Sequence, residues 1–139
     1  MVRRTITALA AVLMAGSMVA ITSSPAEAAT CKRFSDRLQG KPGYPPANCK
    51  LKINKTTVHR HTWVLISSPG YRPGERVNID IRDYKGQSIR MCSQIAGGYG
   101  TIYKLCEVPV SVSAGPHFIS GFGLASGEWR TASLNVLVP

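Results

Sequence analysis

The chain has 139 residues, and its 17 Lys and Arg against 7 Asp and Glu give a formal net charge of +10. This length allows one folded domain, not two. Because carboxylates are few and there are only 3 histidines, the composition offers little for acid–base catalysis or for a metal centre.

The first 28 residues are expected to form a secretory signal peptide. A basic start, "MVRR", precedes the apolar run "TITALAAVLMAGSMVAI" and the small-x-small cleavage signal "AEA" at 26–28. A transmembrane anchor is the competing interpretation, but the run is short and lacks flanking stop-transfer charges. Cleavage before Ala29 leaves 111 residues (139 minus 28) with 15 basic and 6 acidic side chains, a charge of +9. We therefore expect a secreted protein, extracellular or loosely associated with the cell surface.

All four cysteines, Cys31, Cys49, Cys92 and Cys106, follow the predicted cleavage site. An even number in a small exported chain predicts two disulfides, for which three pairings are possible. Metal binding is the alternative, but there is no CxxC pair and histidine is scarce, so no metal site is expected.

Residues 29–49, "ATCKRFSDRLQGKPGYPPANC", have no sustained periodicity and are rich in Pro, Gly and basic residues. They predict a disulfide-closed N-terminal loop with a helical turn near "FSDRLQ". From residue 50 the apolar residues alternate with polar ones, which is typical of strands. The expected strands cover 50–54, 63–67, 76–82, 88–95, 101–110, 117–123 and 133–138. About seven short strands between regular turns predict an all-β fold, an antiparallel β-sandwich over 50–139.

The stretch "PGYRPGE", residues 69–75, lies between two of these strands. Gly70 can adopt a positive φ, Pro73 fixes its own φ, and Gly74 completes the turn. The turn is therefore predicted to be structural, with the Tyr71 ring over the end of the core.

Two tryptophans differ in their surroundings. Trp63 lies in a dense apolar strand and is predicted to belong to the core. Trp129 stands between Glu128 and Arg130, and its pattern fits either a rim aromatic used in binding or half-buried packing.

Three stretches carry a family resemblance: "SPGYRPGERVNIDI", "GGYGTIYKLCEVPV" and "SAGPHFISGFGLASGEWRTASLNV". Together they resemble an immunoglobulin-like module repeated in secreted actinobacterial surface proteins, over residues 63–139. The matching positions are Gly70, Tyr71, Pro73, Gly74, Glu75, Val77, Gly100, Thr101, Val108 and Pro109, with a corner at Ala114, Gly115 and Pro116. The resemblance implies a sandwich that serves as a spacer, adhesin or binding unit, and it brings no catalytic residue.

A weaker resemblance is to the neocarzinostatin-like carriers, which are small secreted sandwiches with two disulfides and a chromophore cleft. Their Gly-Gln-Cys is missing here, because "NIDIRDYKG" stands at the equivalent place. This resemblance implies the alternative function of a small-molecule carrier. A secreted inhibitor is a further alternative.

The module resemblance also bears on the disulfides, since a core-facing Val is usual where Cys106 stands. Cys92 and Cys106 each lie seven residues from Tyr99. A hairpin turning at 98–100 would place the two cysteines opposite each other, which leaves Cys31 to pair with Cys49.

Positive charge is concentrated between residues 32 and 60, where eight basic residues face one acid, Asp36. They are Lys32, Arg33, Arg37, Lys41, Lys50, Lys52, Lys55 and Arg60. One interpretation is a solvated surface. The other is an anion-binding face for teichoic acid, acidic polysaccharide, anionic lipid or nucleic acid. No nucleic-acid fold signature accompanies these residues, so the expected partner is an anionic cell-envelope polymer or another surface protein.

The search for catalytic groups predicts no enzyme and no cofactor. His59 and His61, in "VHRH", would share one strand face, but no third ligand is near them in sequence. Serines beside glycine in "ISGFG" and "ASGEW" lack a nucleophile-elbow frame. The chain ends in "NVLVP" without a sorting motif or a transmembrane segment, so non-covalent retention at the surface is expected.

Overall fold

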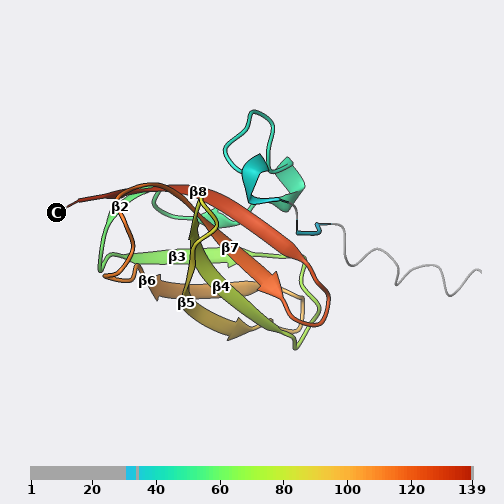
Figure 1. Cartoon of the computed structure of the whole chain (residues 1–139). Coiled ribbons are helices and arrows are strands. Elements are labelled where there is room, and N and C mark those ends of the chain that lie inside the picture. The colour runs from blue at the N-terminus through green and yellow to red at the C-terminus, as the bar shows by residue number, and fades with distance from the viewer. Residues whose placement is uncertain (1–30, 34, 139) are drawn as a thin grey trace, which may run out of the picture.

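The structure is a computed structural model that describes residues 31–33 and 35–138. The predicted signal peptide at 1–28 lies outside the described residues. Two sheets pack face to face (Figure 1), one of five strands in the order β2-β8-β7-β4-β5 and one of three in the order β1-β3-β6. The strands are β1 (Lys52–Ile53), β2 (Thr57–His59), β3 (Trp63–Ser68), β4 (Arg76–Asp83), β5 (Ser88–Ile95), β6 (Ile102–Glu107), β7 (Gly115–Gly123) and β8 (Trp129–Leu137). The predicted β-sandwich class is confirmed.

The core forms where alternating apolar side chains of the two sheets meet. On β4, Val77, Ile79 and Ile81 are at most 1% exposed, whereas the residues between them are half-buried. On β3 of the other sheet, Val64 and Ile66 are fully buried. This period of two is what the sequence pattern of each strand specifies.

The sandwich is antiparallel as predicted except at β2, which adds an eighth strand. Thr57, Val58 and His59 pair in parallel with residues 135–137 of β8. In β2 only Val58 is buried, so the segment carries too little alternation to be recognised from sequence. Between β1 and β2 the chain therefore crosses from the three-stranded sheet to the edge of the five-stranded sheet.

The predicted hairpin between β5 and β6 is wrong, because these strands belong to different sheets. The loop at 96–100 instead folds over the 71–75 turn: the Tyr71 N–H donates to the carbonyl of Gly100, and the Ala96 N–H donates to that of Glu75. The Cys92–Cys106 disulfide forms nonetheless, with 5.9 Å between the Cα atoms. It joins an edge strand of one sheet to an edge strand of the other, since β5 and β6 each end their sheet.

The 70–74 turn has the predicted conformation. Gly70 and Gly74 have φ values of 101° and 83°. The Tyr71 ring is 5% exposed, and its hydroxyl donates to the carbonyl of Gly121 at 2.9 Å. The turn is thus held by the core beneath it.

The two tryptophans differ in burial, and Trp63 is not where the apolar pattern predicts it. Trp63 is 53% exposed, so its predicted place in the core is wrong. Since Val64 and Ile66 point inward, strand alternation directs Trp63 to the outer face. Trp129 is 3% exposed and packs edge-on against Phe118, with 6.2 Å between the ring centroids. Of its two interpretations, packing is the one that the structure supports.

Candidate anion-binding surface

The eight basic candidates lie on two neighbouring parts of the chain. Lys32, Arg33, Arg37 and Lys41 are exposed on the N-terminal loop, and Lys50, Lys52 and Lys55 are exposed along and beside β1. Arg60 is half-buried, and its Nε donates to the Val112 carbonyl at 2.7 Å. The structure therefore uses Arg60 to hold a loop, and seven side chains remain for an external anion.

The one acid of this region does not oppose the exposed cations. The Asp36 carboxylate lies 3.5 Å from the Arg82 guanidinium, and both side chains are mostly buried. Because Arg82 comes from β4, a basic residue outside the region neutralises Asp36. The exposed lysines and arginines consequently face solvent without a compensating carboxylate from their own segment.

Lys50 and Lys52 line a groove between the N-terminal loop and the edge of β8. We call it the lysine groove. Its volume is about 440 Å³. Its lining residues are Tyr44, Pro45, Lys50, Leu51, Lys52, Ile53, Thr56, Thr131, Ala132 and Ser133.

The floor of the lysine groove is a short open edge of β8. The Leu51 N–H donates to the Thr131 carbonyl at 2.9 Å, and the Asn135 N–H donates to the Thr56 carbonyl at 2.8 Å. Between these attachments the chain departs to form β1 in the other sheet. Since strand alternation gives Ser133 the same orientation as Thr131 and Asn135, its backbone N–H and C=O face the groove. An anion in the groove would meet a backbone donor beside two ammonium groups.

Tyr44 closes one wall of the groove. Burial raises the pKa of the Tyr44 phenol above its ordinary value of 10.0, so the phenol stays protonated at neutral pH. A neutral phenol adds no repulsive charge to the groove.

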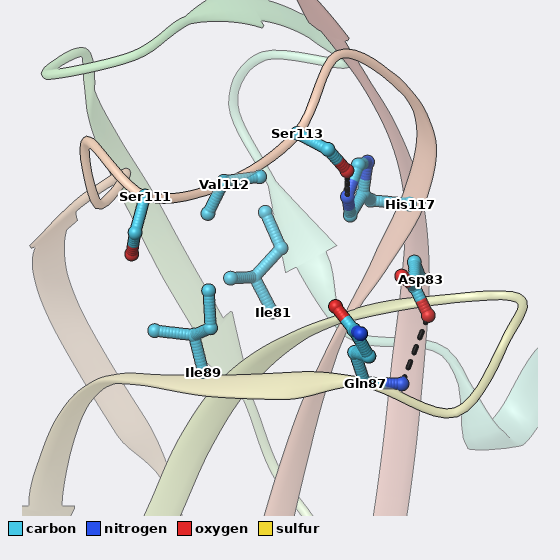
Figure 2. Close-up of a pocket in the computed structure, with 8 residues that line it drawn as sticks. All are labelled: Ile81, Asp83, Gln87, Ile89, Ser111, Val112, Ser113 and His117. Carbon is cyan, nitrogen blue, oxygen red and sulfur yellow. Dashed lines mark hydrogen bonds between the residues drawn. The ribbon is translucent and has the colours of Figure 1, made fainter.

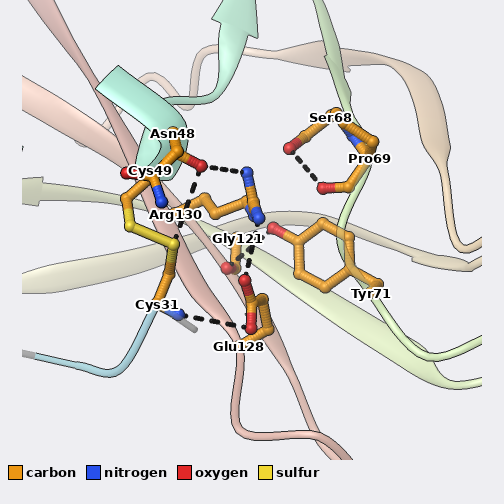
Figure 3. The surroundings of a disulfide bond; sticks show 9 residues. All are labelled: Cys31, Asn48, Cys49, Ser68, Pro69, Tyr71, Gly121, Glu128 and Arg130. Atoms are coloured by element: carbon orange, nitrogen blue, oxygen red, sulfur yellow. Dashed lines mark hydrogen bonds and ion pairs between the residues drawn. A yellow bond between two sulfur atoms is a disulfide. The ribbon is translucent and has the colours of Figure 1, made fainter. Parts of the chain in front are cut away.

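Covalent and buried polar contacts hold the N-terminal loop on the sandwich (Figure 3). The Cys31–Cys49 disulfide closes the loop, with 5.6 Å between the Cα atoms. Arg130 donates to the Asn48 carbonyl at 2.6 Å and to the Glu128 carboxylate at 2.9 Å. The Glu128 side chain is fully buried. The wall of the groove is therefore anchored to β8.

Sequence reasoning missed the structural role of three charged residues. In the sequence Glu128 and Arg130 are only polar neighbours of Trp129, yet in the structure they form the buried pair described above. The Glu75 carboxylate is also buried and accepts hydrogen bonds from the N–H groups of Ala125 and Ser126 at 2.9 and 2.8 Å. The available signal for Glu75 was its place in the Gly-aromatic-x-Pro-Gly-Glu pattern of the family resemblance.

A second, smaller cavity lies at the end of the sandwich near the 83–87 turn (Figure 2). It holds about 50 Å³ and includes His117 and Ser113 in its lining. The Ser113 hydroxyl lies 3.3 Å from His117 Nε2, and His117 Nδ1 lies 2.9 Å from the Gly115 carbonyl. Asp83 instead accepts hydrogen bonds from the N–H groups of Lys85 and Gln87. The serine and histidine therefore lack the carboxylate that orients a catalytic triad.

The histidine pair considered in the sequence does not share a strand face. β2 ends at His59, and His61 has a φ of 67° and contacts the Glu107 carboxylate at 3.0 Å. Among residues 31–33 and 35–138, no group of three or more His, Cys, Asp and Glu side chains could hold a metal ion. In the same part of the chain, no helix is long and apolar enough to cross a membrane.

The two-sheet architecture defines an immunoglobulin-like sandwich module. The sequence matches the macroglobulin-like domain family over residues 47–136, which is more than half of the chain. The protein belongs to this family. The matched range includes β1 to β7 and all of β8 but its last residue, and it begins within the N-terminal loop.

Comparison with solved structures supports the fold. Macromomycin is similar with a TM-score of 0.52 and 14% sequence identity, over 63% of this chain and 97% of that chain. At this identity the likeness concerns the fold alone. No curated protein matches the sequence significantly.

Proposed function

We propose that the protein is a secreted, non-enzymatic interaction module that binds an anionic cell-surface polymer through the lysine groove and the adjoining N-terminal loop. The observation that carries this proposal is the combination of exposed Lys50 and Lys52 with the outward backbone of Ser133. Cations beside a backbone donor favour carboxylate, phosphate or sulfate groups. The resemblance to surface modules of actinobacteria agrees with an envelope polymer as the partner.

A small-molecule carrier is the second candidate, because the sequence has a weaker resemblance to the neocarzinostatin-like carriers. A carrier needs a deep apolar pocket, and small-molecule sites usually hold about 300–1,000 Å³. The cavity of Figure 2 holds only about 50 Å³. The lysine groove is larger, but lysines flank it and it opens on the surface, so its geometry favours a charged polymer over an apolar ligand.

Co-sedimentation with purified cell walls, measured over a series of salt concentrations, tests the proposal. Binding by charge is expected to weaken steeply as salt rises, since it releases counterions and is screened within about 10 Å at 0.1 M salt. A variant with Lys50, Lys52 and Lys55 replaced by Gln should bind more weakly than wild type.

The matched control replaces Arg72, Arg76 and Lys85 by Gln, because these exposed side chains lie outside the 32–60 region. Both variants lose three charges, so a specific role of the groove requires the first variant to lose more binding. Equal losses, or binding that does not respond to salt, would contradict the groove as the site.

A further inference from the structure

The outer face of the three-stranded sheet carries apolar side chains where a solvated sheet carries polar ones. Leu65 on β3 stands directly opposite Leu105 on β6, and Trp63 and Tyr103 lie two residues from them on the same face. Trp63, Tyr103 and Leu105 are 53%, 68% and 52% exposed. We call these four residues the apolar face. Exposed apolar groups that lie together on one surface mark an interaction site.

Lysines border the apolar face. Lys52 on β1 stands opposite Ser67, which stands opposite Tyr103, so the three residues form one row across the sheet. The Lys55 ammonium lies 3.4 Å from the Trp63 carbonyl. The acid on this side of the sheet, Glu107, stands opposite Trp63 and is paired with His61 at 3.0 Å. The border of the apolar face is therefore mainly cationic.

The chemistry of this face points to one class of partner. A second copy of the chain would bring its own lysines against these, which disfavours self-association. A hydrophilic polymer gains little from the two leucines at the centre, whereas a hydrocarbon surface buries them. Trp and Tyr favour the boundary between headgroups and acyl chains, and bordering lysines attract anionic lipids.

We propose that the apolar face docks on the surface of an anionic lipid bilayer, with Trp63 and Leu105 in the interfacial layer and the lysines at the headgroups. The proposal adds an apolar contact to the charge-based polymer binding proposed above. The two share Lys52 and Lys55, but the apolar face is needed for the lipid contact alone.

The two tryptophans make the docking measurable. Trp63 is 53% exposed and Trp129 is 3% exposed, so a soluble quencher such as acrylamide reaches Trp63 selectively. The titration uses vesicles of equal parts phosphatidylglycerol and phosphatidylcholine, with pure phosphatidylcholine vesicles for comparison. With the anionic vesicles, we expect a blue shift of the emission and loss of acrylamide quenching. Pure phosphatidylcholine should give a much smaller change.

Two leucines provide matched variants. Leu105 on the apolar face is 52% exposed, and Leu124, in the connection between β7 and β8, is 53% exposed. Leu105→Ser should weaken vesicle binding by roughly tenfold, which is the order expected from burial of one leucine side chain. Leu124→Ser should bind like wild type. Both positions are exposed, so neither change is expected to unfold the protein.

The remaining outcomes count against the proposal. Vesicle binding that leaves Trp63 open to acrylamide would mean that charge alone holds the protein. Equal binding by Leu105→Ser and Leu124→Ser would also mean that charge alone holds the protein. No vesicle binding would leave an apolar protein surface as the partner of this face. Cell-wall binding by Leu105→Ser should be unchanged, so failure of the lipid proposal can be distinguished from failure of the polymer proposal.

Discussion

Glu75 is the residue whose removal tests the interior organisation of the sandwich most directly. Its carboxylate accepts four hydrogen bonds, from the backbone N–H groups of Arg72, Ala125 and Ser126 and from the Ser126 hydroxyl. The carboxylate thereby joins the 70–76 turn to the connection between β7 and β8. The side chain is 6% exposed, so water cannot easily replace it.

Glu75→Gln keeps the size of the side chain and removes its charge. One carboxylate oxygen becomes an NH₂ group. This group is itself a donor and cannot accept hydrogen bonds from the donors that face it. A hydrogen bond to a charged group is worth about 1.5–3 kcal/mol. Because the Ser126 hydroxyl can rotate away, we expect a total loss of about 3 kcal/mol at pH 7. For a domain of this size that corresponds to a fall in Tm of roughly 12 °C.

The effect should also depend on pH. Burial by itself would raise the pKa of Glu75, but hydrogen bonds from Ser126, Arg72 and Ala125 hold the pKa below its ordinary value of 4.5. A depressed folded-state pKa stabilises the protein above the ordinary value, and this stabilisation is lost as pH falls through the folded-state pKa. The gap between wild type and Glu75→Gln should therefore shrink in acid.

Thermal and urea melts at neutral and acidic pH measure both effects. Glu107→Gln is the matched control, since Glu107 is a partly exposed glutamate paired with His61, and it should change the free energy of unfolding by less than about 1 kcal/mol. If Glu75→Gln melts with wild type at pH 7, or if the gap is the same in acid, the reasoning on the Glu75 hydrogen bonds is refuted.

Two further predictions concern the turn and the disulfides. A Cβ at Gly70 would collide with the Arg130 guanidinium, whereas a Cβ at Gly74 meets open space, and both glycines have positive φ. In urea melts, Gly74→Ala should cost about 1 kcal/mol and Gly70→Ala distinctly more; equal costs would contradict the packing around Gly70. Non-reducing peptide mapping of the purified protein should find the pairs Cys31–Cys49 and Cys92–Cys106 and no free thiol, and a peptide linking Cys49 to Cys92 would refute this pairing.

The parts of the fold that could be predicted are those in which the local sequence pattern determines burial or backbone conformation. The alternation in "RVNIDIR" is strict, so the burial on β4 follows from the letters alone. The turn at Gly70 and Gly74 was predictable because few residues other than glycine adopt a positive φ. The prediction for Trp63 was wrong because "WVLIS" is apolar on both faces of the strand. Composition therefore could not tell whether the odd or the even positions face the core.

The parts that could not be predicted depend on contacts between distant segments. Equal spacing about Tyr99 suggested a hairpin, but the change of sheet at 96–101 is set by hydrogen bonds to the 71–75 turn. The lysine groove likewise exists because the chain leaves β8 after Leu51 and returns at Thr56. The clustering of basic residues was visible in sequence. The backbone of Ser133 beneath them was not, since it lies some eighty residues further along the chain.

The N-terminal loop is bonded to the sandwich, although most of it lies outside the range that matches the family. The family match begins at residue 47, yet the Trp129 N–H donates to the carbonyl of Cys31, and Cys31 is bonded to Cys49. A chain cut at residue 47 would lose that disulfide and uncover part of the Glu128–Arg130 pair, which folding has removed from water. The N-terminal loop thus covers buried polar groups of the sandwich. We therefore expect a chain that begins at Cys31 to be more stable than one cut at residue 47.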